Sequence, residues 1–157
     1  MEHIWAPWRI EFILGEKPEG CFLCQRPQES DDRSCLILFR AERNFVILNR
    51  YPYNPGHLLI APYSHVPTLE DLSDEETLEH FDLVKRCTRA LRHAFQPAGF
   101  NIGINQGRTA GAGVADHMHT HVVPRWEGDT NFMPVVADTR ILPQALQSTY
   151  DKLLGLI

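Results

Sequence analysis

The run HMHTH at residues 117–121 constrains the fold of this chain more than any other segment. Histidine recurs at every second position, and the run continues into two valines and a proline. In an extended strand successive side chains point to opposite faces, so the spacing predicts a strand over residues 117–124 with all three imidazoles on one face. Imidazole can act as nucleophile, acid, base or metal ligand near neutral pH. We therefore expect this histidine run to carry chemistry; the alternative is a chance cluster on a solvated strand.

Length and charge indicate a single globular domain. The 157 residues, 43% of them hydrophobic, are enough to bury one core, and we expect one domain over residues 1–157 with an aromatic, proline-rich arm (1–20) and a C-terminal extension (126–157). The formal net charge of −5 argues against a nucleic-acid partner, which would require a basic surface. No apolar run approaches the length of a membrane span, and the first residues lack the basic start of a signal peptide. The expected location is therefore the cytoplasm, with no membrane partner.

The pattern of apolar residues and turn signals predicts an α+β fold with a mainly antiparallel sheet. Ser73 and Glu76 form a capping box, and apolar residues then recur at helical spacing, so one long helix is expected over 74–95. A second helix is expected near 143–155. With strands before and after it, the long helix is expected to pack on one face of the sheet. The expected strands cover residues 34–39, 44–49, 57–61, 100–105 and 117–124.

Single side chains on the long helix carry expectations of their own. The apolar residues whose helical spacing predicts this helix are Leu78, Phe81, Val84, Leu91 and Phe95. His80 and His93 are expected at the surface, where a solvated histidine on a helix is the common case.

The four cysteines divide into two pairs with different expected roles. Cys21 and Cys24 have the two-residue gap of a metal knuckle or a redox pair. Cys35 and Cys87 lie in apolar patterns and are expected to be small buried hydrophobic residues. A disulfide scaffold is not expected in a chain of this size and location.

A glycine-rich turn over residues 107–113 precedes the histidine run. Glycine lets backbone amides approach an anionic group closely, as they do in phosphate cradles. Most glycine-rich turns only reverse the chain, but this one lies beside three imidazoles. A phosphate held next to a neutral imidazole favours attack by nitrogen on phosphorus, which gives a covalent phosphohistidine.

Taken together these motifs resemble the histidine triad (HIT) superfamily. The histidine run matches the H-x-H-x-H-x-x signature, and residues 45–49, 54–62, His65 and 105–125 fall where that family has its core strands and nucleotide loop. The flanking segments are similar to the bacterial branch of diadenosine tetraphosphate phosphorylases, which cleave dinucleoside polyphosphates with inorganic phosphate. The resemblance implies a HIT-like fold and an enzyme acting on adenosine nucleotides.

The resemblance also implies roles for individual residues. His119 would be the nucleophile that attacks the α-phosphorus, with the backbone carbonyl of His117 holding the proton on its other ring nitrogen. His121 would contact phosphate oxygens, and Asn105 would orient the phosphate or the leaving group. Asn49 stands where the family has a ribose-binding residue; a strand-end cap before the following turn is the alternative.

The substrate-binding turn departs from the family pattern at one position. Gly111, Ala112 and Gly113 are expected to offer backbone amides to phosphate oxygens. The position of Gly113 is commonly Ser or Thr in the family, with a hydroxyl near the leaving group. Its absence bears most on phosphoramidates, because their amine leaving group must be protonated.

In HIT proteins with an N-terminal C-x-x-C motif, two histidines complete a structural zinc site. Here the resemblance implies Cys21, Cys24, His65 and His117 as ligands of Zn²⁺. The alternative is two reduced, unliganded thiols, with His65 capping the approach to the helix.

Three functional hypotheses follow for the whole chain. The first is a phosphorylase, or a hydrolase that uses water in place of phosphate on diadenosine polyphosphates or nucleoside phosphoramidates. The second is a purine-nucleotide-binding module without catalysis, which the glycine at position 113 favours. The third is a catalytic metal on the histidine run with Asp116 as the nearest carboxylate. The family also implies a homodimer formed through the long helix and a core strand.

Overall fold

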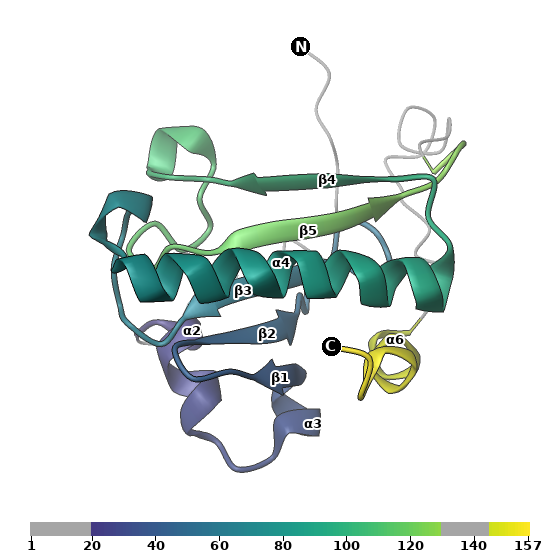
Figure 1. Ribbon diagram of the computed structural model, residues 1–157, viewed down its shortest axis with the longest axis horizontal. Helices are drawn as coiled ribbons and strands as arrows, with labels where there is room; N and C mark the ends of the chain where they lie inside the picture. The colour runs from purple at the N-terminus through teal and green to yellow at the C-terminus, as the bar shows by residue number, and fades with distance from the viewer. Residues whose placement is uncertain (1–19, 130–144) are drawn as a thin grey trace.

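Five strands form one antiparallel sheet, in the order β1-β2-β3-β5-β4. The computed structural model describes residues 20–129 and 145–157. The longest helix, α4 (Asp74–Phe95), runs along the sheet and covers one of its faces (Figure 1). The α+β class expected from the sequence is therefore confirmed. The strands are β1 (Ile37–Arg40), β2 (Asn44–Leu48), β3 (Leu58–Pro62), β4 (Gly99–Ile104) and β5 (Thr120–Arg125).

Helix α4 begins and ends where its sequence signals predict. The Ser73 side chain accepts from the Glu76 amide, and the Glu76 carboxylate accepts from the Ser73 amide, so the capping box is formed. The helix ends at Phe95, and the C-cap residue Gln96 has a left-handed conformation (φ 49°) that turns the chain into the following proline. Its buried side chains are His80, Leu83, Val84, Cys87, Ala90 and Leu91.

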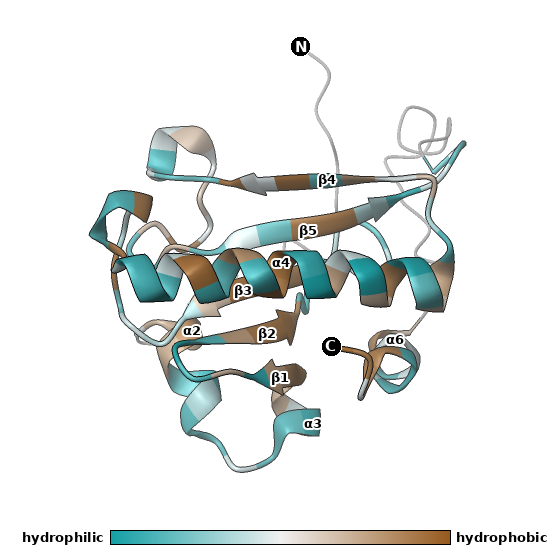
Figure 2. Ribbon diagram, in the orientation of Figure 1, coloured by the Kyte–Doolittle hydropathy of each residue, from teal (hydrophilic) through white to brown (hydrophobic). Residues whose placement is uncertain are grey.

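Two apolar residues of α4 do not pack on the sheet. Leu78 is 77% exposed and Phe81 is 43% exposed, although both belong to the apolar spacing that predicts the helix. The exposed strand residue Ile102 of β4 pairs with Val122, which places it on the same side of the sheet as α4. Figure 2 shows brown, hydrophobic segments on both α4 and β4.

The centre of the core lies in β2 and β3, which are buried along their whole length. These two strands, expected over 44–49 and 57–61, pair as an antiparallel hairpin with Phe45 opposite Ala61 and Ile47 opposite Leu59. Both faces of these strands are covered, which explains why their sequences are almost continuously apolar instead of alternating.

The segment before β1 differs from its prediction. A strand was expected from Ser34, but Asp32–Cys35 form the short helix α3, and β1 begins only at Ile37. The Asp31 carboxylate accepts from the amides of Arg33 and Ser34 and so caps this turn. A local side-chain cap therefore outweighs the apolar pattern at this point.

The C-terminal helix α6 (Leu146–Leu153) packs beside β1 and α4. The Tyr150 hydroxyl donates to the Ile37 carbonyl at 2.9 Å, and Leu153 is completely buried. The sequence predicted this helix over 143–155, and the first two of those residues lie outside the described part of the chain. The same is true of residues 1–19 of the aromatic arm.

Two short elements matter for the site described below. Helix α2 (Phe22–Gln25) is a single turn, followed by a 3-10 turn over Arg26–Gln28.

Within residues 20–129 and 145–157, no helix combines the length and apolar composition that a membrane crossing requires. The expectation of a single domain over the whole chain stays a prediction.

Candidate active site and metal cluster

A cavity of about 230 Å³ opens on the face of the sheet opposite α4. His121 is paired with Leu59 in the sheet, and both line this cavity, whereas the intervening Thr120 points to α4. Its lining includes the apolar residues Phe22, Leu36 and Ile47. Its lining contains two arginines and no carboxylate among the described residues, so its charge suits an anionic ligand.

The ring of His119 is held in one protonation state. It is only 5% exposed, and its Nδ1 lies 2.8 Å from the backbone carbonyl oxygen of His117. A carbonyl can only accept, so Nδ1 carries the proton and Nε2 keeps its lone pair. Burial lowers the pKa of His119, and the bond to the His117 carbonyl opposes this shift in part. The neutral ring therefore persists below the ordinary pKa of histidine.

The proton of His121 is placed by a second histidine. The backbone amide of Tyr53 donates to Nδ1 of His57 at 3.1 Å, so the neutral His57 ring carries its proton on Nε2. That Nε2 lies 2.9 Å from Nδ1 of His121 and donates to it. His121 is thus left with its proton on Nε2. Its ring centroid is 4.9 Å from that of His119, so the ring with a bare Nε2 and the ring with an Nε2–H are direct neighbours.

His57 is buried with no exposed surface. What the sequence did not show is its partner, because His57 and His121 are 64 residues apart. The two strands β3 and β5 bring them together by pairing.

Asn49 and Asn105 both line the cavity. The Asn49 side chain also accepts from the Tyr51 amide at 2.9 Å, so the strand-end cap considered as its alternative role is present in the structure. Asn105 follows directly after β4 and faces the same cavity as His119.

The glycine-rich turn contributes Gly111 and Gly113 to the cavity lining. Gly111 has φ 83°, a left-handed conformation that favours glycine, and it ends a 3-10 turn over Arg108–Ala110. Its amide donates to the Arg108 carbonyl, and the Ala112 amide donates to the Gly107 carbonyl, at 3.0 and 3.4 Å. Two of the three amides expected to meet phosphate are therefore engaged within the turn.

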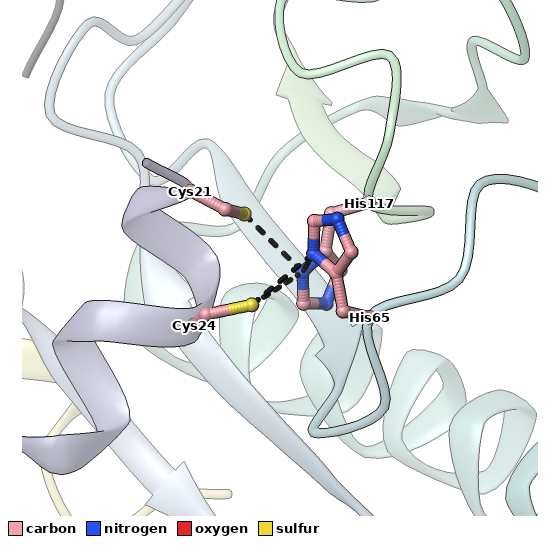
Figure 3. Close-up of side chains that lie close together, drawn as sticks. All are labelled: Cys21, Cys24, His65 and His117. Atoms are coloured by element: carbon pink, nitrogen blue, oxygen red, sulfur yellow. Dashed lines mark hydrogen bonds between the residues drawn. The ribbon is translucent and has the colours of Figure 1, made fainter. Parts of the chain in front are cut away.

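Cys21, Cys24, His65 and His117 come together and form what we call the Cys/His cluster (Figure 3). Their four ligand atoms all lie within 4.8 Å of one another. Ligands of a tetrahedral zinc ion are separated by roughly 3.3–3.8 Å, for Zn–N of about 2.0–2.1 Å and Zn–S of about 2.3 Å, and the shortest separations in the cluster are close to this range. The closest pairs are Cys21 Sγ to His117 Nδ1 at 3.3 Å, Cys24 Sγ to His65 Nδ1 at 3.2 Å and His65 Nδ1 to His117 Nδ1 at 3.3 Å.

Protonation also fits a metal at this cluster. Nε2 of His117 donates to the Pro62 carbonyl at 2.9 Å, which leaves the lone pair of Nδ1 directed at the cysteines. Burial and the neighbouring Cys21 thiol raise the pKa of Cys24 to about 11. The thiolate of Cys24 is thus disfavoured beside Cys21 alone, whereas a cation bound between the two sulfurs would stabilise the thiolate form. The residues present therefore suit a divalent metal, and the set of two sulfur and two nitrogen ligands is one that zinc favours.

The position of His117 changes the picture of the histidine run. Strand β5 begins at Thr120 and not at His117, because the amide of Met118 donates to the Val66 carbonyl at 2.7 Å instead of to a strand. The His117 ring faces the Cys/His cluster and does not line the cavity. The expectation of three imidazoles along one strand face is therefore wrong for this residue.

His80 is a buried polar residue that the sequence did not reveal. It was expected at the surface, but it has no exposed area. Its Nδ1 lies 2.9 Å from Asn44 Oδ1, and its Nε2 lies 2.7 Å from Thr120 Oγ1. The Asn44 amide donates to the Glu76 carbonyl and the Glu79 carboxylate, so Asn44 Oδ1 accepts from His80, and His80 Nε2 accepts from Thr120.

The only sequence signal for this contact is the polar residue Thr120 in a run whose other intervening positions are apolar. Burial lowers the pKa of His80 to about 4, with a smaller contribution from His119. The ring is therefore neutral and purely structural in its hydrogen bonding.

The histidine run does not form a metal site of its own. Among the described residues, the Cys/His cluster is the one group of three or more His, Cys, Asp or Glu ligands close enough to share an ion. Asp116 is exposed and outside it. The described residues therefore offer no set of ligands that would hold a catalytic metal on the histidine run.

Known proteins share both the sequence pattern and the fold. The HIT domain matches residues 31–128. An AP-4-A phosphorylase of Mycobacterium tuberculosis is 36% identical over 159 aligned positions, covering 95% of this chain and 80% of the relative. A bis(5'-nucleosyl)-tetraphosphatase (asymmetrical) of Schizosaccharomyces pombe is 33% identical over 93 positions, covering 59% of this chain and 50% of the relative.

A solved structure supports the same assignment. The crystal structure of a Zn-bound histidine triad family protein from Mycobacterium smegmatis is 27% identical, with a TM-score of 0.69, and covers 87% of this chain and 92% of its own. The resemblance drawn from the motifs is therefore confirmed. Since the HIT domain spans most of the described residues, and the relatives include HIT-type enzymes, this chain belongs to the histidine triad family.

Proposed function

We propose that this chain is a nucleotidyltransferase that cleaves dinucleoside polyphosphates by forming a nucleoside-phosphohistidine on His119. One observation carries the proposal: His119 has its proton locked on Nδ1 by a backbone carbonyl, while Nε2 has no hydrogen-bond partner among the described residues. A neutral imidazole with an unprotonated nitrogen, lining a cavity with two arginines, can attack the phosphorus atom of a bound nucleotide as a nucleophile. The similarity to an AP-4-A phosphorylase supports the choice of substrate.

The first step is attack of His119 Nε2 on the α-phosphorus of the bound nucleotide. A nitrogen–phosphorus bond forms, and the bond from phosphorus to the bridging oxygen breaks, so the rest of the polyphosphate leaves with that electron pair. His121 donates from Nε2 to a non-bridging oxygen and stabilises the charge that builds up there. Asn105 orients the phosphate or the leaving group from the end of β4.

In the second step an oxygen of inorganic phosphate attacks the α-phosphorus of the phosphohistidine. A phosphorus–oxygen bond forms, the nitrogen–phosphorus bond breaks, and its electron pair returns to His119 Nε2, which restores the neutral ring. With diadenosine tetraphosphate the products are ATP from the first step and ADP from the second. Asn49 holds the ribose from the cavity wall, since a cap formed by its side-chain oxygen leaves further hydrogen-bonding capacity. The amide of Gly113 is assigned to a phosphate oxygen in preference to the engaged amides of Gly111 and Ala112.

The glycine at position 113 fits this choice of substrate. A polyphosphate leaving group departs as an anion at neutral pH and requires no proton, whereas the amine of a phosphoramidate does. The missing hydroxyl therefore penalises phosphoramidates more than dinucleoside polyphosphates.

Product analysis with diadenosine tetraphosphate and labelled phosphate tests the proposal. We expect ATP and labelled ADP only when phosphate is present, and no product from His119→Ala. ATP and AMP formed without phosphate would assign the chain to the hydrolases, an alternative that the similarity to the S. pombe tetraphosphatase favours. Tight AMP binding without turnover of either kind would identify a binding module.

We also propose that the Cys/His cluster holds a structural Zn²⁺. It would join the α2 segment to the loops that carry His65 and His117. The expected stoichiometry is one zinc per chain by elemental analysis, with a lower melting temperature after chelation. Purified chain that contains no metal and melts at the same temperature with chelator would contradict it.

The exposed apolar residues on the α4 side support a homodimer. Leu78, Phe81 and Ile102 are 77%, 43% and 48% exposed, and burial of such side chains is what drives association. The expected mass in light scattering is that of two chains, falling to one in Phe81→Glu. A monomeric parent protein would rule the homodimer out.

A further inference from the structure

The segment that carries two ligands of the Cys/His cluster also forms a wall of the nucleotide cavity. Cys21 is the N-terminal cap of α2 and Cys24 lies within its single turn. Phe22, between them, and Arg26, just after them, both line the cavity. In Figure 3 the α2 turn points both sulfurs toward the two imidazoles. The cluster and the cavity are therefore built on opposite sides of the same six residues.

A second connection runs through His117. Its Nδ1 faces the cysteines, and its backbone carbonyl holds the Nδ1 proton of His119 at 2.8 Å. The next residue, Met118, is bonded through its amide to Val66, one position after His65. A movement of the His65 or His117 ring would therefore shift the backbone that positions His119.

Without a metal the α2 segment has limited support. A one-turn helix cannot form on its own, because nucleation costs more than a single turn of hydrogen bonds returns. Leu23 anchors the segment in the hydrophobic core with no exposed area, whereas Phe22 is only half-buried. Leu23 keeps α2 near the sheet, and the Arg40 guanidinium holds the turn that follows by donating to the Pro27 and Glu29 carbonyls. Within α2 itself, the two cysteines are the side chains that face His65 and His117.

We propose that a metal ion in the Cys/His cluster sets the shape of the nucleotide cavity through Phe22 and Arg26, so that metal and nucleotide bind with positive coupling. The inference rests on the proposed nucleotide-binding function of the cavity and on the cluster as a metal site. Coupled binding is reciprocal: if the metal increases nucleotide affinity by a given factor, the nucleotide must increase metal affinity by the same factor.

The first experiment measures binding and needs no turnover. AMP is titrated calorimetrically into zinc-loaded and metal-free protein, with circular dichroism to follow the fold. We expect metal-free protein to keep its sheet and α4, and to bind AMP about 10-fold more weakly. Zinc affinity, measured by competition with a chromophoric chelator, should rise by the same factor in saturating AMP. Equal AMP affinity in both forms would overturn the coupling while leaving the proposed function intact.

The second experiment uses matched variants and does not depend on the metal-free fold. With Co²⁺ in the cluster, AMP should change the visible absorption bands of the metal if the cavity and the cluster share α2. Phe22→Ala should abolish this change at AMP saturation. Phe39→Ala is the control, since Phe39 is also a half-buried aromatic residue packed on the core but lies in β1, outside the cavity lining.

The outcomes separate the two levels of inference. Absence of AMP binding to zinc-loaded protein would reject the nucleotide cavity, and absence of metal binding would reject the cluster as a metal site. An AMP-independent Co²⁺ spectrum, or a response retained in Phe22→Ala, would reject the coupling alone.

Discussion

His119 and His80 lie against the two faces of the same strand segment and are almost equally buried, at 5% and 0% exposed. On the cavity face, His119 has one nitrogen bonded to a carbonyl and the other directed to the cavity. On the helix face, both nitrogens of His80 are bonded, one to Asn44 and one to Thr120. Burial lowers the pKa of both rings, so burial and protonation do not distinguish them.

The difference between the two faces lies in the hydrogen bonds. A neutral imidazole has one donor and one acceptor nitrogen, and it is available for chemistry only when one of them is left for a ligand. The helix face uses both nitrogens of His80 to tie α4 to β5, whereas the cavity face uses only one nitrogen of His119. A buried histidine is therefore structural or reactive according to the partner of its second nitrogen.

Of the substitutions that test the difference between the two histidines, the one on the cavity face should have the largest effect, and that effect should be on the rate of catalysis. His119→Ala removes the nucleophile, and we expect cleavage of diadenosine tetraphosphate to fall by at least about 10⁴-fold with little loss of stability. Steady-state kinetics and thermal unfolding of the same preparation measure the two quantities. Substantial residual turnover would show that another group carries the reaction.

The corresponding change on the helix face should act on stability instead. His80→Ala leaves a cavity and two unpaired polar partners, so the free energy of unfolding should fall by about 2–4 kcal/mol. Urea denaturation measures this loss. Turnover per folded molecule should stay within about an order of magnitude of the parent protein, since His80 touches no cavity-lining atom in its hydrogen bonds. A loss of turnover in His80→Ala as large as that in His119→Ala would contradict the conclusion that His80 has a structural role and His119 a catalytic one.

Acid should weaken the fold through the same residue. In the unfolded chain His80 takes up a proton near pH 6.5, whereas in the folded protein its pKa is lowered to about 4. The unfolded state therefore binds more protons between these values, and stability falls as the pH drops through this window, by up to ~3 kcal/mol. Unfolding free energies measured from pH 7 to pH 4 should show this slope, and His80→Gln should flatten it. An unchanged slope in His80→Gln would assign the effect to other groups.

The smallest expected effect comes from the partner of His80. Thr120→Val keeps the shape of the side chain but removes the hydroxyl that donates to His80 Nε2. We expect a loss of about 1–2 kcal/mol in the free energy of unfolding, because a buried acceptor is left unpaired. Chemical denaturation of Thr120→Val beside Thr120→Ser provides the measurement. A Val variant as stable as the parent protein would mean that this hydrogen bond contributes little.

Local signals in the sequence predicted several elements closely. The capping box at Ser73 and Glu76 defined the start of α4 to the residue, because both of its hydrogen bonds are made within four residues. The strands expected over 44–49 and 57–61 are present as β2 and β3, which pair with each other. Predictions failed where contacts from distant segments compete with the local pattern, as at Met118, whose amide bonds to Val66 and delays the start of β5.

The candidate site divides in the same way. Spacing alone singled out the histidine run and the Cys21-x-x-Cys24 pair, since those residue types at those intervals have few other uses. The structure brings His119, His121, Asn49 and Asn105 to one cavity and the cysteines to His65 and His117. His80 was placed on the wrong side of α4, because helical periodicity does not show that a polar strand residue will meet it.

The sequence by itself determined the kinds of reactive groups, their spacing and the family to which they belong. Only the tertiary structure decided which nitrogen of each histidine is bonded. Those bonds join His80 to residues 36 and 40 positions away, and His57 to one 64 positions away. A hydrogen bond depends on distances of about 3 Å between atoms, and such proximity arises only once the strands have paired and α4 has packed on them.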